Sequence, residues 1–468
     1  MNHAGTADTY LAFLLVSVRT GLALDISLAG LGGCPADLPR RRIRYRPPTM
    51  RLHDENDVGV VAGAGRRSAP RPVIVMGEHI DAHVLRKYQT IEKIGKGAYG
   101  IVWKAIDRRS RKTMAVKKIF DAFRNATDAQ RTFREIMYLQ ELGEHPNIIR
   151  MTDVMKAEND LDIYVVFEFL DLDLHAVIKA NILEEVHKKY IIYQSLKALK
   201  YLHSGELLHR DMKPSNILIN SECHVKLCDF GLARSVSSIS NDGPHVLTEY
   251  VATRWYRAPE ILLGSNYYTK GVDMWSIGCI LAEMLGGKPL FPGSSTLNQL
   301  ERIIQVIGMP SQDDLDAIGS EFAQTMLETM NVPQERTKWE DLFPGANPLA
   351  LDLIDRLLQF NPNKRLSARQ AIMHPYLGEF QGSEDEMTLD RVIAIKIDDN
   401  RKYTVADYRG SLYDAIRARK KELVNAKRVV KRRPRLAKTP TPSSYVRKKP
   451  SSSSSSSAPN VKPRAAAK

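Results

Sequence analysis

Leu207-Leu-His-Arg-Asp-Met-Lys-Pro-Ser-Asn-Ile-Leu218, followed shortly by Cys228-Asp-Phe-Gly231, is the stretch of sequence that decides the fold. It places an acid, Asp211, close to a cation, Lys213, and an amide, Asn216, with a second acid, Asp229, further along. Transfer of a phosphoryl group needs a carboxylate that contacts the attacking hydroxyl group, a cation that neutralises phosphate charge, and oxygen atoms that bind a metal ion. The stretch therefore predicts an enzyme that moves a phosphoryl group.

A glycine-rich segment, Gly95-Lys-Gly-Ala-Tyr-Gly100, lies between two predicted strands, residues 89–94 and 103–106. Its spacing alone is a weak signal, because dinucleotide-binding folds use the same letters. Here no helix follows the glycines, which argues against a dinucleotide fold. Glycines carry no Cβ atom, so the backbone N–H groups can close over a triphosphate.

Lys117 lies on a third predicted strand, residues 114–119, and Glu135 lies on a predicted helix, residues 128–142. We expect the Lys117 ammonium to hold two phosphates while pairing with Glu135. The neighbouring Lys118 is interpreted as solvated.

With these motifs in this order, residues 88–378 resemble the eukaryotic protein kinases. The resemblance implies an α+β, bilobal fold with a β-rich N-lobe at residues 88–170 and a helical C-lobe at residues 171–378. Residues 1–87 are predicted to be a mostly disordered extension, residues 379–425 an extension with a docking helix, and residues 426–468 a basic, Pro/Ser-rich disordered tail.

The resemblance also implies the cofactors ATP and Mg²⁺, and it assigns roles to single residues. Asp211 would accept or orient the substrate hydroxyl, and Lys213, typical of serine/threonine kinases, would neutralise the γ-phosphate. Asn216 and Asp229 would bind the metal, since Mg²⁺ prefers oxygen ligands. The predicted cofactor-binding residues are Gly95, Lys96, Gly97, Gly100, Val102, Ala115, Lys117, Phe167, Glu168, Leu170, Asp173, Asn216 and Asp229.

Two residues of the deciding stretch leave alternatives open. His209 is either a packed structural histidine or an acid or base, and the first interpretation is favoured. Cys228 is either a small core residue or a thiol that an electrophile in the nucleotide site can reach.

Thr248-Glu-Tyr250, just ahead of Val251-Ala-Thr-Arg-Trp-Tyr-Arg-Ala-Pro-Glu260, is similar to the activation segment of the MAP kinases. The resemblance implies phosphorylation of Thr248 and Tyr250, substrates with proline after the Ser or Thr, and a Thr253 that bridges Asp211 and Lys213. Guanidinium groups form short, charge-assisted bonds with phosphate. The candidate phosphate ligands are Arg131, Arg134, Arg210 and Arg234 for Thr248, and Arg254 and Arg257 for Tyr250.

Finer matches at residues 103–109, 119–135 and 167–170 and in the predicted helix from Val405 resemble the atypical MAP kinases of the extracellular-signal-regulated kinase 7/8 group, also called MAP kinase 15. Members are considered to phosphorylate their own activation segment. The resemblance makes Phe167 the gatekeeper, and it implies a location in cytoplasm and nucleus and at the centrosome or ciliary base. Glu260 with Arg365 would form a buried ion pair, and Asp273 would support the catalytic loop.

Two other functions stay open at this point. One is a kinase-fold scaffold that acts by binding, although every catalytic position is present. The other is a cyclin-dependent-like kinase, suggested by Phe167-Glu-Phe-Leu170 and opposed by Thr248-Glu-Tyr250.

The net charge of +14 is concentrated at the ends of the chain. Residues 391–468 carry +17 and residues 1–75 carry +4, which leaves −7 for residues 76–390. The basic cluster at residues 427–435 is interpreted as a nuclear-import signal, a contact to a polyanion, a nucleic-acid contact (the least favoured) or a solubilising tail.

Further expectations concern partners and compartment. The apolar run at residues 10–18 is too short to span a membrane, and the four cysteines contain no C-x-x-C pair, as in a reduced intracellular protein. Glu384-Asp385-Glu386 is either a docking site for partner proteins or a solvated run. The chain is expected to be a monomer, and translation from Met1 or from Met76 is left open.

Overall fold

The computed structural model describes residues 79–97, 99–236, 253–265, 269–328, 330, 336–382, 386–399 and 401–432. The chain divides into one unit that ends at Asp414 and a second that begins at Ala415. The first contains the two predicted lobes. In the second, the described residues continue the long helix α14, Val405–Arg432, which begins in the first unit.

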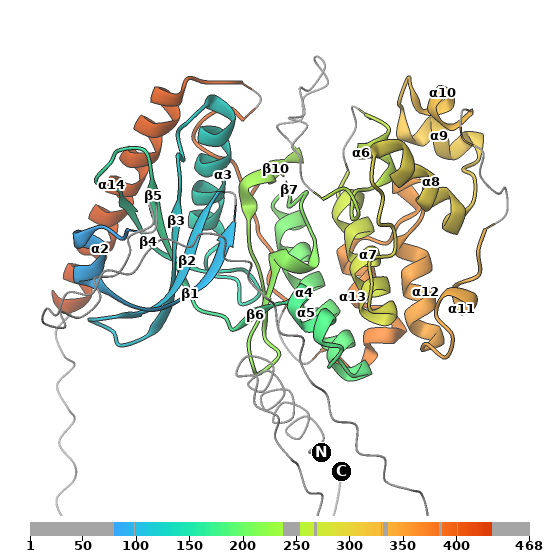
Figure 1. Cartoon of the computed structure of the whole chain (residues 1–468), viewed down its shortest axis with the longest axis horizontal. Helices are drawn as coiled ribbons and strands as arrows, with labels where there is room; N and C mark the ends of the chain where they lie inside the picture. The colour runs from blue at the N-terminus through green and yellow to red at the C-terminus, as the bar shows by residue number, and fades with distance from the viewer. Residues whose placement is uncertain are drawn as a thin grey trace, which may run out of the picture. The chain divides into compact units, whose positions relative to one another are not determined.

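The N-lobe is an antiparallel sheet of five strands in the order β1-β2-β3-β5-β4, with the helix α3 beside it (Figure 1). β1, β2, β3 and α3 follow the segments that alternation and helical spacing predicted, whereas β4 was not predicted. Asn125 ends the preceding loop, and its side chain accepts a hydrogen bond from Asp128 N, which caps α3. Their bounds are β1 Tyr88–Gly97, β2 Gly100–Asp107, β3 Thr113–Ile119, α3 Ala126–Leu142, β4 Met151–Lys156 and β5 Ile163–Glu168.

A short helix that the sequence analysis did not predict, α2 (Ala82–Lys87), precedes the sheet. Its Val84, together with Ile80, is buried in the same apolar cluster as Tyr88 and Tyr164. Lys118 was interpreted as solvated, and this interpretation was wrong. Its side chain is only 7% exposed, because it donates to His79 O at 3.0 Å and pairs with Asp162 at 3.3 Å.

The C-lobe is built around the helix α7 (Gly271–Gly286), of which 13 of 16 residues are buried, and the helix α5 (Glu185–Ser204). A helix buried on nearly all sides marks the centre of a lobe. The other helices are α4 Leu174–Ala180, α6 Pro259–Leu262, α8 Thr296–Ile307, α9 Gln312–Ile318, α10 Ala323–Glu328, α11 Trp339–Leu342, α12 Pro348–Leu357 and α13 Ala368–Ile372, with 3-10 turns η1 Pro214–Asn216, η2 Phe230–Leu232, η4 Pro362–Lys364 and η5 Pro375–Phe380.

Two small sheets carry the catalytic segment between the lobes. One joins β6, β8 and β9, and the other pairs β7 with β10. Their bounds are β6 Leu172–Asp173, β7 Leu207–Leu208, β8 Ile217–Ile219, β9 Val225–Leu227 and β10 Arg234–Ser235.

A buried ion pair fixes the C-lobe. Arg365 donates to both carboxylate oxygens of Glu260, at 2.6 and 2.7 Å, and both side chains are almost fully buried. The resemblance implied this pair.

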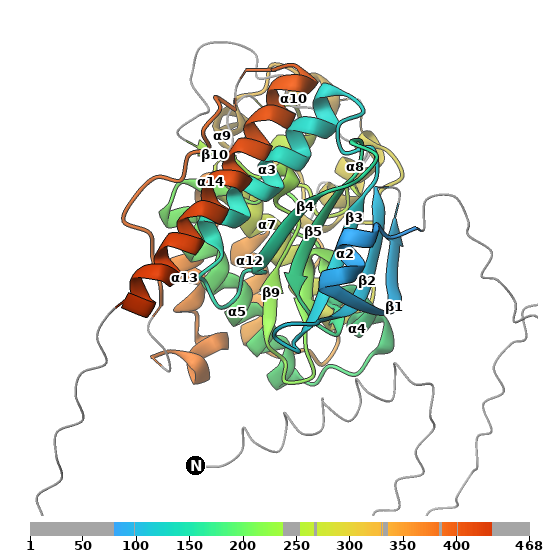
Figure 2. The same ribbon diagram turned by 90° about the vertical axis from the view of Figure 1, so that its left-hand side faces the viewer.

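Residues 386–414 form a segment that we call the strap, of which Asn400 is not described. It follows the C-lobe, where Ile393 N donates to Gly205 O at 2.8 Å, and it ends in the first turns of α14 beside α3 (Figure 2). There the rings of Phe133 and Tyr408 lie 5.8 Å apart. Tyr408 and Leu412 of α14 are both buried. The strap therefore contacts both lobes.

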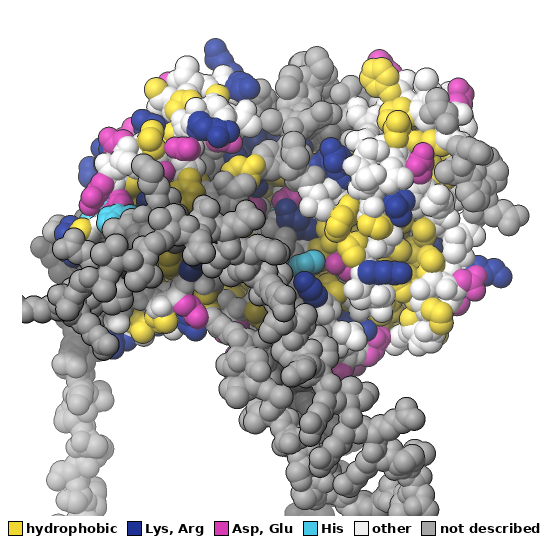
Figure 3. All heavy atoms as spheres, viewed as in Figure 1, with side chains coloured by type: hydrophobic (Ala, Val, Ile, Leu, Met, Phe, Trp, Pro, Cys, Tyr) yellow, Lys and Arg dark blue, Asp and Glu magenta, His cyan; other side chains and the backbone are white. Residues whose placement is uncertain are grey.

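Charged side chains of both signs are mixed over the face of the described residues in Figure 3. None of the helices in the described part of the chain combines the length and the apolar character that a membrane crossing needs.

Candidate active site

The catalytic loop joins β7 to the turn η1. Asp211 lies at its centre, where its Oδ2 accepts hydrogen bonds from Lys213 Nζ at 2.8 Å and from Asn216 Nδ2 at 3.0 Å. Its Oδ1 accepts no hydrogen bond from the described residues. One carboxylate oxygen is thus held in place, and the other is available to a hydroxyl.

Asp273, in α7, binds the backbone of this loop. Its two oxygens accept hydrogen bonds from the backbone N–H groups of His209, at 2.9 Å, and Arg210, at 2.8 Å. Burial alone would raise the pKa of Asp273, but the contact with His203 lowers it overall, so the carboxylate stays charged. Since Arg210 has a positive φ of 65°, these bonds stabilise a backbone conformation that side chains rarely adopt.

His209 is a packed structural histidine. Its side chain is fully buried, one ring nitrogen lies 3.1 Å from Cys228 O, and the ring lies 4.8 Å from that of Phe230. This geometry leaves it no path to a substrate proton. The thiol of Cys228 has a pKa raised by burial and by Asp229, which disfavours the reactive thiolate.

Asp229 begins the turn η2 with a left-handed backbone, φ 64°. Arg131, from α3, donates to its Oδ2 at 3.2 Å. Burial would raise the pKa of Asp229, but Arg131, Lys117 and Lys213 lower it overall, so the carboxylate is ionised. The positive charges that surround Asp229 are those expected where anionic phosphates are bound.

Lys117 and Glu135 form the predicted pair across the N-lobe. Lys117 Nζ donates to Glu135 Oε1 at 2.8 Å. Burial would lower the pKa of Lys117, but the carboxylates of Glu135 and Asp229 raise it overall. The ammonium group is therefore charged, and α3 lies in the position that brings Glu135 to it.

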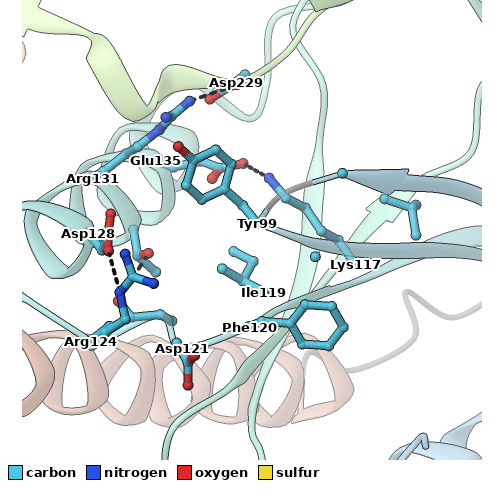
Figure 4. Close-up of a pocket in the computed structure, with 15 residues that line it drawn as sticks. Tyr99, Lys117, Ile119, Phe120, Asp121, Arg124, Asp128, Arg131, Glu135 and Asp229 are labelled. Carbon is cyan, nitrogen blue, oxygen red and sulfur yellow. Dashed lines mark hydrogen bonds and ion pairs between the residues drawn. The ribbon is translucent and has the colours of Figure 1, made fainter. Parts of the chain in front are cut away.

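A cavity of about 460 Å³ lies under the β1–β2 hairpin, between β3 and α3. Seven of the predicted site residues line it, and Figure 4 shows Lys117 pointing to Glu135, and Arg131 to Asp229, from opposite sides. The seven are Gly97, Gly100, Val102, Lys117, Arg131, Glu135 and Asp229.

Gly100, at the start of β2, lines this cavity. A Cβ atom there would lie 2.0 Å from the backbone oxygen of Lys118, so only glycine lets β2 approach β3 this closely. Gly95 and Lys96 lie on β1, upstream in the same hairpin.

The predicted cofactor-binding residues Ala115, Phe167, Glu168, Leu170 and Asp173 lie outside the lining of that cavity. Ala115 pairs with Phe167 across β3 and β5, and Phe167 is 8% exposed. Asp173 Oδ1 caps α4 by accepting from Ala176 N at 2.9 Å. Glu168 Oε1 pairs with Lys226 at 3.0 Å, and Leu170, half-buried, follows β5.

The donor set fits a nucleotide with a divalent metal. Asn216 directs its Nδ2 to Asp211, which leaves its Oδ1 without a hydrogen bond among the described residues. That oxygen and the ionised Asp229 carboxylate are hard oxygen donors. The two residues are those that the sequence predicted for the metal.

The predicted phosphate ligands of Thr248 do not form one open cluster. Arg131 contacts Asp229, and Arg210 NH1 donates to Leu232 O at 3.4 Å. Arg134 and Arg234 both contact Asp399 of the strap. The structure therefore divides the four arginines, because carboxylates of this chain already lie against three of them.

Thr248 and Tyr250 lie outside the described residues, as do Glu384 and Asp385. Glu386, described, pairs with Lys200. Arg254 and Arg257 are half-buried just beyond the activation segment.

Thr253 was expected to bridge Asp211 and Lys213, and this structure does not bring it to them. It is exposed and makes no hydrogen bond with either within the described part of the chain. Lys213 Nζ donates directly to Asp211 at 2.8 Å, so the contact between these two residues forms without Thr253.

Two residues of this region were not predicted from the sequence. Tyr99 lines the cavity with its ring 5.2 Å from the Arg131 guanidinium. An aromatic residue inside the glycine-rich segment was the available signal. Asp399 had no comparable signal, because it lies 265 residues from Arg134 in the chain.

Comparison with known proteins adds independent evidence. The family described as "Protein kinase domain" matches residues 88–377. The chain is 62% identical over 347 residues to "Extracellular signal-regulated kinase 2" of Dictyostelium discoideum, which covers 74% of this chain and 94% of that protein.

It is 56% identical over 355 residues to "Mitogen-activated protein kinase 15" of Xenopus laevis, covering 75% of this chain and 60% of the relative. It is 47% identical over 346 residues to "Extracellular signal-regulated kinase 7" of Drosophila melanogaster, covering 72% and 38%. The match therefore spans less than two thirds of the frog and fly proteins.

Proposed function

Because this chain belongs to the protein kinases, in the group of MAP kinase 15 and extracellular-signal-regulated kinase 7, we propose that this MAP-kinase-type serine/threonine kinase phosphorylates Ser or Thr followed by proline, and phosphorylates its own Thr248 and Tyr250. The alternatives of a binding scaffold and of a cyclin-dependent-like kinase are not favoured, since the relatives bear MAP kinase names.

The arrangement of Asp211 carries the proposal. Its Oδ2 is held by Lys213 and Asn216, so its Oδ1 can accept the proton of a substrate hydroxyl as that oxygen attacks. Lys213 lies where it can neutralise charge that develops on the transferred group. The side chains supply position and charge and form no covalent bond with the substrate.

The kinase fold implies ATP and a divalent metal, and we propose Mg²⁺ as that metal, held by Asn216 and Asp229. When bound, the ion neutralises charge on the phosphates. Arg131 donates to Asp229 Oδ2 at 3.2 Å, and Asp229 Oδ1 would be the oxygen that holds the ion. The charged Lys117 is placed to hold the phosphates from the N-lobe side.

The preference for proline is supported by the resemblance of residues 251–260 to the MAP kinases. Proline has no backbone N–H, so a substrate groove that offers no acceptor at this position leaves no donor unpaired. We extend the proposal to proteins that dock at Glu384-Asp385-Glu386, and to a location in cytoplasm and nucleus and at the centrosome or ciliary base.

Self-phosphorylation is tested by expressing the full chain in a bacterial host without eukaryotic kinases. Mass spectrometry then maps Thr248 and Tyr250 in the wild type and in Asp229→Ala. We expect phosphate on both residues in the wild type and on neither in the variant. Phosphate absent from both proteins would remove self-phosphorylation from the proposal.

Substrate choice is tested with a pair of peptides that differ only in Ser-Pro against Ser-Ala. We expect a higher kcat/KM for the Ser-Pro peptide. Asp211→Asn should lower kcat on it by about 10²- to 10³-fold, the typical cost of losing one transition-state contact. Equal kcat/KM values for the two peptides would refute the preference for proline.

A further inference from the structure

Asp399 of the strap lies between two buried arginines. Its Oδ1 accepts a hydrogen bond from Arg134 Nε at 2.6 Å, and its backbone oxygen accepts one from Arg234 NH2 at 3.0 Å. Its Oδ2 lies 3.7 Å from Arg234 Nε, within ion-pair distance. The Asp399 side chain is 5% exposed and each arginine side chain 8%, so water screens this contact little.

The two arginines belong to the two halves of the active site. Arg134 immediately precedes Glu135 on α3, and Glu135 holds Lys117 at 2.8 Å. Arg234 lies in β10 and pairs with Leu208 of β7, directly before the catalytic loop. One carboxylate therefore connects the helix that positions Lys117 with the strand pair that leads to Asp211.

An anion is needed at this place. Two buried guanidinium groups repel each other and lose hydration, and an opposite charge close to both, here 2.6 Å from Arg134 Nε and 3.7 Å from Arg234 Nε, compensates both effects. Arg134 and Arg234 are also two of the arginines predicted to bind phosphate on Thr248. The structure supplies an anion from the chain itself.

The strap is anchored to the rest of the protein on both sides of Asp399 in the chain. On one side Leu389 N donates to Ser204 Oγ at 2.8 Å, and Arg391 pairs with Glu141 of α3 at 2.6 Å. On the other side the ring of Tyr408 lies against Phe133 of α3. The carboxylate is thus held in position before any ligand binds, which reduces the entropic cost of the contact.

We infer that Asp399 is a positioning residue that performs, as a carboxylate, the alignment that phosphate on Thr248 performs. It holds α3 so that Glu135 meets Lys117, and it gives the kinase activity before Thr248 is modified. The inference rests on the proposed function, because phosphate binding by Arg134 and Arg234 is part of that proposal.

The test uses the full chain carrying Thr248→Ala, which cannot receive the phosphate. Asp399→Asn keeps the shape and removes the charge, and Asp398→Asn is the matched control, since Asp398 is the exposed neighbour. The measured quantities are kcat and the KM for ATP with a Ser-Pro peptide. We expect Asp399→Asn to lower kcat by about 10- to 100-fold, as for a misplaced catalytic group, and Asp398→Asn to stay within about twofold.

A second background separates alignment from simple support of the fold. Asp399→Asn is also measured with Thr248 intact and phosphorylated, as a fraction purified by anion exchange. If the variant does not phosphorylate its own Thr248, added wild-type enzyme phosphorylates it in trans. We expect the loss in kcat to shrink to about threefold or less, because the phosphate replaces the missing anion.

Three results would overturn the inference. They are an unchanged kcat, an increased kcat, which would make Asp399 inhibitory, and an equal loss in both backgrounds, which would make it only structural. Since Thr248→Ala cannot carry phosphate, the first measurement stays valid if the chain fails to phosphorylate itself. Failure of that proposal is seen separately, by mapping Thr248 and Tyr250.

Discussion

At the scale of single residues, burial decides what each polar side chain does. Asp211 and Asp273 are both acids of the catalytic region, but Asp273 is fully buried and both of its oxygens are occupied, whereas Asp211 keeps one oxygen available. Burial also gives predictions for the stability of the fold at two positions, Gly100 and His145.

Gly100→Ala should destabilise the N-lobe. The added Cβ would lie 2.0 Å from Lys118 O, which is backbone and cannot rotate away. Overpacking of this kind costs about 1–3 kcal/mol, so the melting temperature should fall by several degrees. The matched control is Gly97→Ala, because a Cβ atom there meets nothing within 4 Å. Equal melting temperatures for the two variants would contradict the packing argument.

His145 should make stability depend on pH. Burial, with Lys197 and Lys226 nearby, lowers its pKa from 6.5 to about 3, and its Nδ1 accepts a hydrogen bond from Asn147 N. Below pH 6.5 the unfolded chain takes up a proton that the folded chain refuses. This contribution to stability is therefore complete above pH 6.5 and is lost as the pH falls from there toward 3.

Between pH 7.5 and 5.5 the loss from His145 should be about 1.4 kcal/mol. In His145→Gln the pH dependence of the free energy of unfolding, measured with urea, should be smaller by this amount. His224→Gln serves as the control, because that side chain is 54% exposed. An unchanged pH dependence in His145→Gln would show that His145 is not the group responsible.

At the scale of elements, one ion pair holds three parts of the C-lobe together. Arg365, just after η4, contacts Glu260 of α6 and also donates to Gly271 O at the start of α7. Two further bonds reach Gln359 O and Phe360 O. The guanidinium donors are thus satisfied without water, and every one of these contacts depends on the same side chain.

Glu260→Gln should cost about 3–5 kcal/mol of folding free energy, the usual result of leaving a buried charge without its partner. Arg356→Gln removes an ion pair to Asp352 whose side chains are 55% and 42% exposed, and it should cost about 1 kcal/mol or less. Chemical denaturation of both variants measures the difference. A similar cost for the two would argue against the importance of burial here.

At the scale of the whole molecule, the strap is the feature that joins the lobes. It contacts the C-terminal end of α5 at Ser204 and the following Gly205, and it contacts α3 through Glu141, Arg134 and Phe133. A segment outside the kinase domain match therefore influences the position of an active-site helix.

Ile393→Ala should loosen the strap from the C-lobe. Ile393 is fully buried against Gly205, and loss of such a side chain costs about 2–5 kcal/mol. We expect a lower melting temperature, faster proteolytic cleavage after residue 386 and reduced kinase activity. Val392→Ala, at an adjacent side chain that is 47% exposed, is the control and should change none of the three. Wild-type cleavage rates in Ile393→Ala would refute the anchoring role.

The parts of the fold and site that the sequence predicted are those encoded locally. The glycine-rich hairpin, Lys117 with Glu135, and Asp211 with Asn216 each lie within short motifs whose spacing reflects the chemistry. The α2 helix, the burial of Lys118 and the contact of Asp399 with Arg134 depend on residues 39 to 265 positions apart. No local sequence pattern predicts such contacts, because they form only when the lobes and the strap pack together.

A phosphate group is added by one enzyme and removed by another, whereas a carboxylate is encoded in the gene. The contact between Arg134 and Asp399 therefore keeps α3 in its active position even after a phosphatase has removed the phosphate. Turning the kinase off completely requires a different event, such as displacement of the strap, lower abundance of the protein or a partner that occupies the nucleotide site.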